Sequence, residues 1–187
     1  MIPAKSLALR ISCAALMLLL VAPAVSRGAD AGTGDKQVVF LVRHAEKVDA
    51  SGDPELASAG KKRALALAAT LRDAGIQQIH SSDYTRTRDT AAPIAAALGL
   101  KLNLYDPHDL SRLAESVKAA GGRHLIVGHS NTTGEVVALL GGDPGEPIDD
   151  REYDRLYSVT IDSGGVTTVL LHYGERSPPS SPPLPSQ

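Results

Sequence analysis

An arginine and a histidine stand side by side at the end of an apolar run in the segment LVRHAEK, residues 41–47. A guanidinium or an imidazole is costly to bury without a partner, so an ordinary strand would end before Arg43 and His44. An arginine fork matches two oxygens of a phosphate, and a fixed histidine can attack phosphorus to form a covalent intermediate. The pair therefore indicates a pocket for a small anion. In it, His44 would be a neutral nucleophile held by a hydrogen bond at its other ring nitrogen.

Polar side chains also follow two other apolar runs. Ser81 and Ser82 end the second predicted strand, with Arg86 close behind, and His129 ends the run RHLIVGHS, residues 123–130. In open sheets of parallel strands, ligands collect at the carboxyl ends of the strands, so these segments should meet in one crevice. Two arginines and two histidines there would create a positive potential that an anion neutralises.

The segments that must position these residues alternate between short β-rich runs and alanine-rich stretches, as is typical of a parallel sheet covered by helices on both faces. We therefore predict one α/β domain over residues 37–174, built as three layers (α/β/α) with a mainly parallel sheet. The predicted strands are residues 37–43, 76–83, 101–106, 123–130, 154–162 and 165–174, of which the last two form an antiparallel hairpin. The predicted helices are residues 58–75, 85–99, 109–119 and 132–142.

The first predicted helix has Ser58 as its expected N-cap. The segment KKR, residues 61–63, is interpreted as a solvated helix face, from which Arg63 could lean toward the pocket rim. The apolar and long side chains at the spacing of one helix face are Leu65, Ala68, Ala69 and Arg72.

Four segments in this order, LVRHAEK, LASAGKKRA, SSDYTRTRDTAA and LIVGHSN, resemble the histidine phosphatase superfamily. The first motif of that family is Arg-His-Gly, and its members include phosphoglycerate mutases. The resemblance extends from about residue 38 to 174 and implies a phosphoglycerate mutase-like fold. It also implies that His44 is the phosphorylated nucleophile, that Arg43 and Arg86 grip the phosphate, and that His129 is the second pocket histidine.

The chain departs from the family pattern at Ala45, where glycine is usual, and at Ala57, where many members carry Ser or Thr. The family's glutamate after the third strand, which protonates the leaving oxygen, has no unambiguous match. Asp106 is our first candidate for this general acid because it ends the third predicted strand. Asp109 has the position of a helix cap. Glu46 is a second candidate, either as an acid or as a residue that orients pocket groups.

We expect no cofactor and no metal ion. The histidines outside the motifs show no H-x-x-x-H pair and have no cysteine partner, so we interpret them as structural or solvated: His80, His108, His124 and His172. The net charge is −2, and no basic cluster is interleaved with aromatic residues, which argues against a nucleic-acid partner. The expected partner is a small phosphorylated substrate, and the oligomeric state stays open.

A positively charged start, an apolar stretch over residues 11–25 and small residues after it predict a signal peptide over residues 1–31. The stretch is shorter than the roughly 20 residues of a membrane span, so we expect a periplasmic or secreted protein with no stable membrane anchor after processing. Residues 176–187 are rich in proline and serine and predict a disordered tail. Positions after which cleavage would fit are Ala24, Ser26 and Ala31.

Within the family, we expect metal-independent hydrolysis of a phosphomonoester through a phosphohistidine, by a small exported member. Mutase activity is disfavoured because the chain is short. Membership of the acid phosphatase and phytase branch is disfavoured because Ser130 follows His129. Two alternatives stay open. Residues 128–132, GHSNT, resemble the nucleophile elbow of a serine hydrolase with Ser130 as nucleophile, although Thr132 replaces the second glycine. The other alternative is a non-catalytic anion-binding module of the same fold.

Overall fold

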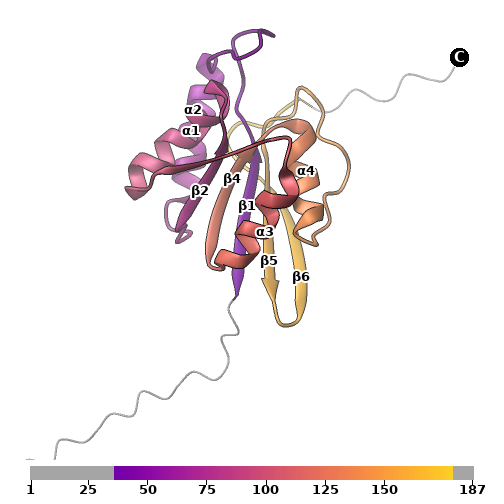
Figure 1. Cartoon of the computed structure of the whole chain (residues 1–187). Coiled ribbons are helices and arrows are strands. Elements are labelled where there is room, and N and C mark those ends of the chain that lie inside the picture. The colour runs from indigo at the N-terminus through magenta and orange to yellow at the C-terminus, as the bar shows by residue number, and fades with distance from the viewer. Residues whose placement is uncertain (1–35, 179–187) are drawn as a thin grey trace, which may run out of the picture. The chain divides into compact units, whose positions relative to one another are not determined.

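The structure, a computed structural model, describes residues 36–178 (Figure 1). The predicted signal peptide, residues 1–31, and most of the predicted tail lie outside the described residues. All the described residues belong to one compact unit. Among them, no helix is both long enough and apolar enough to cross a membrane.

A six-stranded sheet forms the centre of the fold, in the order β3-β2-β4-β1-β5-β6. Neighbours among the first four strands of this order run parallel, whereas β5 is antiparallel to β1, and β6 is antiparallel to β5. The predicted mainly parallel sheet with a C-terminal hairpin is therefore confirmed. The strands are β1 (Gln37–Arg43), β2 (Gln78–Ser82), β3 (Leu102–Tyr105), β4 (Arg123–Gly128), β5 (Arg155–Asp162) and β6 (Gly165–His172).

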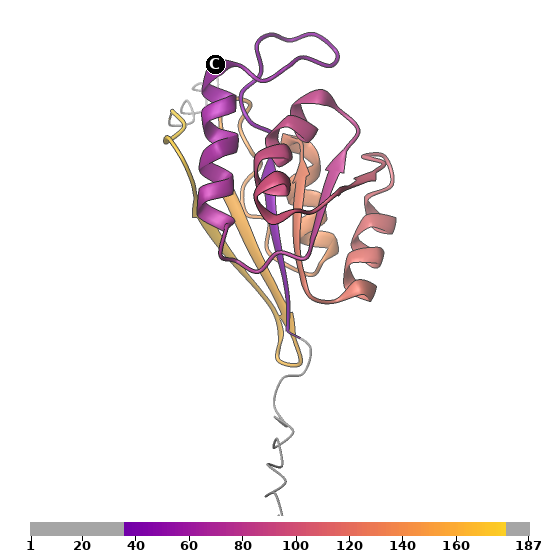
Figure 2. The same cartoon turned by 90° about the vertical axis from the view of Figure 1, so that its left-hand side faces the viewer.

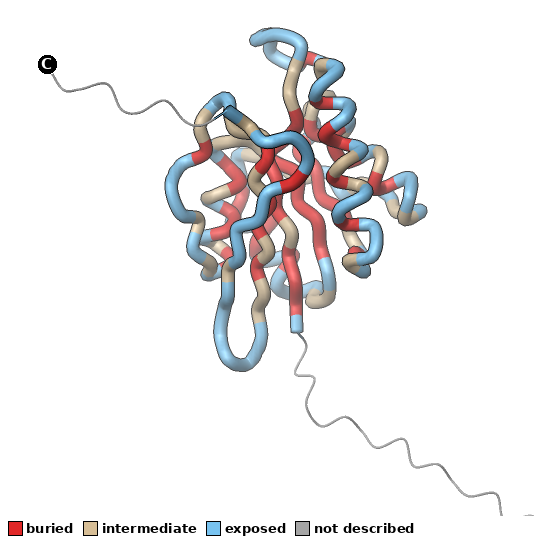
Figure 3. Tube along the Cα trace, turned by 180° about the vertical axis from the view of Figure 1, so that it is seen from behind, coloured by how far each residue is buried: buried red, intermediate tan, exposed pale blue. Residues whose placement is uncertain are grey.

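Four helices cover the two faces of the sheet, α1 and α2 on one face and α3 and α4 on the other (Figures 1 and 2). Their bounds are α1 (Ser58–Leu71), α2 (Thr85–Leu98), α3 (Leu110–Ala120) and α4 (Ser130–Leu139). Successive side chains of β1 point to opposite faces of the sheet and so pack in both helical layers. Leu41 packs in the cluster with α3 and α4, and Val42 packs in the cluster with α1 and α2. The strands are accordingly buried along the centre of the sheet (Figure 3). The three-layer prediction is confirmed.

The start of α1 differs from the prediction. Ser58 is the first helical residue, and Ala57 occupies the N-cap position without a side-chain hydrogen bond. In place of a side-chain cap, close packing at Gly60 fixes the start of the helix. A Cβ atom at this position would collide with the backbone of Glu46, so glycine permits close contact between α1 and the segment that follows β1.

The buried face of α1 also differs from the predicted one. Leu65 is 62% exposed, whereas Leu67 and Arg63 are buried. Arg63 donates to both carboxylate oxygens of Glu46 and to the carbonyl oxygen of Tyr173. A buried guanidinium is tolerated when its charge is paired and its donors are satisfied. Arg63 therefore belongs to the interior and does not lean toward the predicted pocket.

Candidate active site

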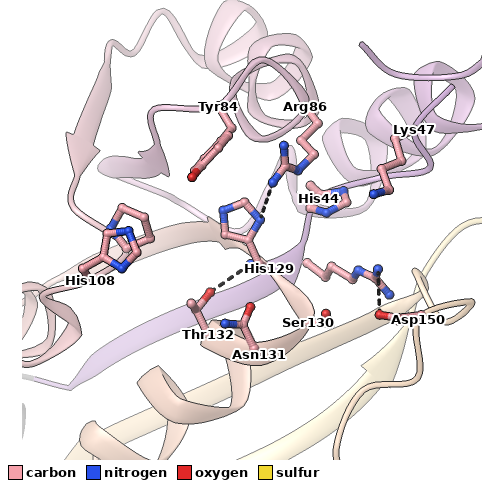
Figure 4. A pocket seen from close by; sticks show the side chains of 12 residues that line it. His44, Lys47, Tyr84, Arg86, His108, His129, Ser130, Asn131, Thr132 and Asp150 are labelled. Carbon is pink, nitrogen blue, oxygen red and sulfur yellow. Dashed lines mark hydrogen bonds and ion pairs between the residues drawn. The ribbon is translucent and has the colours of Figure 1, made fainter. Parts of the chain in front are cut away.

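A pocket of about 310 Å³ lies where the segments that follow β1, β2, β3 and β4 meet (Figure 4). The loop between α4 and β5 closes another side of it. The structure thus brings together Arg43, His44, Arg86 and His129, which the motifs had placed in one crevice. The lining residues are Arg43, His44, Lys47, Tyr84, Arg86, Pro107, His108, His129, Ser130, Asn131, Thr132 and Asp150.

His44 is held at the end of β1 by backbone contacts to two other elements. Its N–H donates to the carbonyl oxygen of Gly128 at 2.8 Å, and the next N–H, of Ala45, donates to Thr90 Oγ1 on α2 at 2.9 Å. Ala45 at the usual glycine position causes no strain, because no non-glycine residue among those described has a positive φ. The nucleophile candidate is therefore anchored to β4 and to α2.

The His44 ring is neutral and has one defined tautomer. Nδ1 lies 2.8 Å from the carbonyl oxygen of Ala45, and because a carbonyl only accepts, Nδ1 carries the proton. Burial lowers the pKa of His44 to about 3, and the charges of Arg43 and Arg86 contribute in the same direction. Nε2 therefore keeps a free lone pair at neutral pH, as attack on phosphorus requires.

A directed chain of hydrogen bonds fixes His129. Arg86 Nη2 lies 3.4 Å from Nδ1 of His129, and because arginine only donates, Nδ1 accepts. Nε2 then carries the proton and donates to Ser82 Oγ at 2.9 Å. Ser82 Oγ donates to Thr87 Oγ1 at 3.0 Å, and Thr87 donates to the carbonyl oxygens of Ser82 and Tyr84, both at 2.8 Å. Burial, with Arg86 next, lowers the pKa of His129 to about 4.

Each pocket arginine lies against a tyrosine ring. The Arg43 Cζ atom is 4.2 Å from the ring centroid of Tyr153, and the Arg86 Cζ atom is 4.3 Å from that of Tyr84. A guanidinium stacked on an aromatic face is attracted to the ring and loses much of its freedom to rotate. Both arginines are thereby oriented by the protein itself.

Among the described residues, no carboxylate lies within hydrogen-bond distance of either pocket arginine. The nearest ion pairs join Arg43 Nη2 to Asp150 Oδ1 and Arg86 Nη1 to Asp53 Oδ1, both at 3.7 Å. Asp150 is 93% exposed, so solvent screens its charge. Within the described part of the chain, the buried Nε atoms of both arginines have no hydrogen-bond partner.

Two other largely buried arginines differ from the pocket arginines, because each is paired with a carboxylate. Arg63 Nη2 lies 2.7 Å from Glu46 Oε1, and Arg155 Nε lies 2.6 Å from Glu152 Oε1. These arginines have their counter-ions within the chain. The pocket arginines keep a positive charge that an external anion can neutralise.

The two candidate acids lie outside this pocket. Asp106 Oδ1 accepts the N–H of His108 at 2.9 Å, and the Asp106 side chain lines a separate cavity beside α3. Glu46 is engaged with Arg63 and borders another cavity. Asp109 caps α3 by accepting the N–H of Arg112 at 3.2 Å. The structure thus does not bring either predicted acid to His44, because each carboxylate has a nearer partner.

Ser130 lines the pocket as the first residue of α4. This helix begins two residues earlier than predicted, and Thr132 Oγ1 accepts the N–H of His129 at 2.9 Å. Across the described ranges, no hydrogen bond joins the Ser130 hydroxyl to a histidine. A serine nucleophile needs such a base, so the geometry gives little support to the serine hydrolase alternative.

The histidines outside the motifs fall into three environments. His80 and His124 are buried and bonded to each other, and His172 pairs with Asp154 at 3.0 Å. His108 is exposed, and its side chain lines the pocket. Sequence reasoning missed His108 as a pocket residue because it lies in a short loop with no periodic signal.

Side chains that could ligate a metal gather outside the pocket, in the described part of the chain, at Glu152, Asp154 and His172. These carboxylates already have partners. Glu152 pairs with Arg155 at 2.6 Å, and Asp154 pairs with His172 and, at 3.7 Å, with Arg176. The group therefore has a structural use as a network of ion pairs.

A family model for the histidine phosphatase superfamily (branch 1) matches residues 39–115, which include the predicted nucleophile and both predicted phosphate-binding arginines. Over these residues, the chain is similar to the histidine phosphatase superfamily. Among curated relatives, it is 27% identical over 154 residues to the probable phosphoglycerate mutase GpmB of Salmonella paratyphi A, covering 73% of this chain and 69% of that protein. It is 40% identical over 76 residues to the same protein of Yersinia enterocolitica, covering 37% of this chain and 35% of the relative.

Solved structures share the fold of this chain. The protein histidine phosphatase SixA complexed with tungstate has a TM-score of 0.57 at 22% identity, over 75% of this chain and 96% of that one. A mycobacterial glucosyl-3-phosphoglycerate phosphatase has a TM-score of 0.58 at 15% identity, over 74% and 98% of the two chains. At these identities, the likeness concerns the fold alone.

Proposed function

We propose that this chain is a histidine phosphatase superfamily member that hydrolyses a phosphomonoester through a phosphohistidine at His44, without a metal ion. The observation that carries the proposal is the arrangement of Arg43 and Arg86 around a neutral histidine. Both arginines are oriented by tyrosine rings, and in the part of the chain that the structure describes neither has a carboxylate at hydrogen-bond distance. A phosphate dianion would complete this charge balance.

In the first step of the proposed reaction, His44 Nε2 forms a bond to phosphorus while the bond from phosphorus to the ester oxygen breaks. The oxygen leaves with the electron pair of that bond and takes a proton from solvent at the open side of the pocket. In the second step, water attacks phosphorus, the P–N bond breaks, and its electrons return to His44. Orthophosphate leaves, and the two guanidinium groups stabilise the charge on the phosphoryl oxygens in both steps.

A second candidate substrate is a phosphoramidate such as phosphohistidine. The observation that favours it is the placement of Asp106 and Glu46, neither of which lines the pocket. A protonated imidazole leaves phosphorus without help from a general acid, whereas an alkoxide needs a proton. The SixA likeness of the fold is consistent with this candidate.

Export is part of the proposal. The predicted signal peptide, residues 1–31, would direct the chain across a membrane and be removed. N-terminal sequencing of the protein recovered from a periplasmic or secreted fraction tests this. A start at Met1 would contradict it.

The decisive experiment compares His44→Ala with Ser130→Ala in the hydrolysis of 4-nitrophenyl phosphate. We expect His44→Ala to lower kcat by about 10³-fold or more, because the nucleophile is lost, and Ser130→Ala to stay within about twofold of wild type. Quenching at alkaline pH with substrate labelled in the phosphoryl group should trap the label on His44, because a phosphohistidine survives base and hydrolyses in acid. Loss of activity only in Ser130→Ala would favour the serine hydrolase. Orthophosphate binding without turnover of any phosphomonoester would favour the anion-binding module.

A further inference from the structure

The pocket continues beyond the phosphate-binding residues into a part lined by rings. We propose that Tyr84, Pro107, His108 and Asn131 form a leaving-group subsite, which binds an aromatic or heteroaromatic ring attached to the phosphate. This inference rests on the proposed function and names the class of substrate for the same site. None of the four residues is an acid or a permanently charged base, unlike the residues around His44.

The geometry of phosphoryl transfer determines where the leaving group lies. The attacking atom and the leaving oxygen stand on opposite sides of phosphorus. His44 attacks through Nε2, because its Nδ1 is bonded to a carbonyl oxygen. In Figure 4, His129, Tyr84 and His108 all lie on the same side of His44, with His108 the farthest from it. A leaving group in line with His44 therefore extends toward Tyr84 and His108.

The side chains on this side suit a flat ring. The Tyr84 ring is packed by the Arg86 guanidinium and stands edge-on to His129, with 5.1 Å between the ring centroids. The exposed His108 imidazole makes no hydrogen bond through its ring to the described residues. Pro107 is half-buried and presents a second apolar ring beside it. Aromatic pairs gain free energy beyond the burial of their area, and the Asn131 amide can contact polar atoms at a ring edge.

The loop that carries His108 is fixed before any ligand arrives. Asp106 Oδ1 accepts the N–H of His108 at 2.9 Å, and the Asp106 carbonyl oxygen accepts the N–H of Asp109 at 3.1 Å. Asp109 in turn caps α3 through the N–H of Arg112. A ring held on such a turn loses little further freedom on binding, so its contacts contribute to affinity. Asp106 thereby has a use as a positioning residue for this wall of the pocket.

The test measures binding by calorimetry and does not depend on turnover. It uses three phosphonates with the same head group: methylphosphonate, n-heptylphosphonate and benzylphosphonate. The last two carry seven carbons each and differ in shape. We expect wild type to bind benzylphosphonate about fivefold more tightly than n-heptylphosphonate, because only the benzyl ring can make aromatic contacts. His108→Ala should bring that ratio close to one and leave methylphosphonate binding unchanged.

Arg112→Ala is the matched control, because Arg112 is exposed four residues further along and lines the separate cavity beside α3. It should keep the wild-type ratio. Equal binding of the benzyl and heptyl compounds by wild type would overturn the subsite while leaving the phosphate site intact. An unchanged ratio in His108→Ala would overturn the role of His108. Failure of wild type to bind methylphosphonate would overturn the proposed function itself and the subsite with it.

Discussion

Ser82 Oγ lies 2.9 Å from Nε2 of His129, which joins the end of β2 to the end of β4 across 47 residues of sequence. The bond does more than pack two side chains together. Because Arg86 can only donate to Nδ1, the Ser82 hydroxyl accepts the one proton that the neutral ring carries. Ser82 therefore determines which nitrogen of His129 faces the pocket arginine as an acceptor.

We predict that Ser82→Ala lowers kcat by about tenfold, since a buried N–H without a partner costs about 1–3 kcal/mol and the ring gives up this tautomer. The ¹⁵N chemical shifts of the His129 ring should show a proton moving to Nδ1. Ser81→Ala is the matched control. Ser81 is equally buried, but its hydroxyl donates to the carbonyl oxygen of Ser82. Equal losses in the two variants would assign the effect to packing.

Arg86→Ala should weaken competitive inhibition by orthophosphate and by vanadate by about 10- to 100-fold, as expected for the loss of charge-assisted hydrogen bonds. Vanadate should be the tighter inhibitor of wild type, because its trigonal-bipyramidal adduct resembles the transition state. Arg88→Ala, on the same helix, provides the comparison. Arg88 pairs with Asp83 and does not line the pocket. If Arg86→Ala folds normally and binds vanadate as wild type does, Arg86 does not contact the phosphate.

The rate of 4-nitrophenyl phosphate hydrolysis should be the same with and without EDTA, because two guanidinium groups neutralise the phosphoryl oxygens in the proposed mechanism. The measurement is the steady-state rate after dialysis against the chelator. A rate that collapses and returns with Zn²⁺ or Mg²⁺ would show that a metal ion takes part.

The free energy of unfolding should fall as the pH falls from about 6.5 toward 4. His124 donates through Nε2 to Gly121, so its Nδ1 accepts from His80 Nε2 at 3.1 Å, and both rings are neutral. Burial lowers the pKa of His80 to about 4, below the value of about 6.5 in an unfolded chain. The unfolded chain therefore takes up protons first, and stability is lost through this window and levels off below it.

The variant that tests this is His80→Gln, which keeps a donor for His124 and removes the titration. In urea unfolding between pH 7 and pH 4, the free energy of unfolding of the variant should depend less steeply on pH than that of wild type. The difference in slope should be up to about 1.4 kcal/mol per pH unit, the limit for one histidine. The buried rings of His44 and His129 should supply a remaining slope. Above pH 7, the wild-type and variant curves should run parallel. An unchanged slope below pH 6.5 would show that His80 is not neutral in the folded protein.

The sheet, its helices and the four motif residues of the pocket could be predicted because each depends on a local pattern. Strand and helix periods are local, and the carboxyl ends of parallel strands meet by topology. The buried face of α1 could not be predicted. Arg63 is buried because Glu46, seventeen residues away in sequence, neutralises it, and Leu65 is exposed as a result of that orientation. No helical period reveals such a partner.

Loop residues were missed for a related reason. Asp106 and His108 lie two positions apart in one short turn, where Asp106 Oδ1 accepts the N–H of His108, and of the two residues His108 lines the pocket. Tyr153 and Asp150 reach the arginine of the first motif from the loop before β5, more than a hundred residues later. Such contacts depend on the path of a loop in space, which residue types alone do not determine.

The place of β1 in the sheet has a consequence for how the protein would lose activity. β1 is paired along its length with β4 on one side and β5 on the other, and it ends in Arg43. Fraying begins at termini and exposed loops, while central strands open only with the whole domain. Amide protons of β1 should therefore be among the slowest to exchange with deuterium. Heat inactivation should coincide with global melting, with no inactive but folded population below the transition.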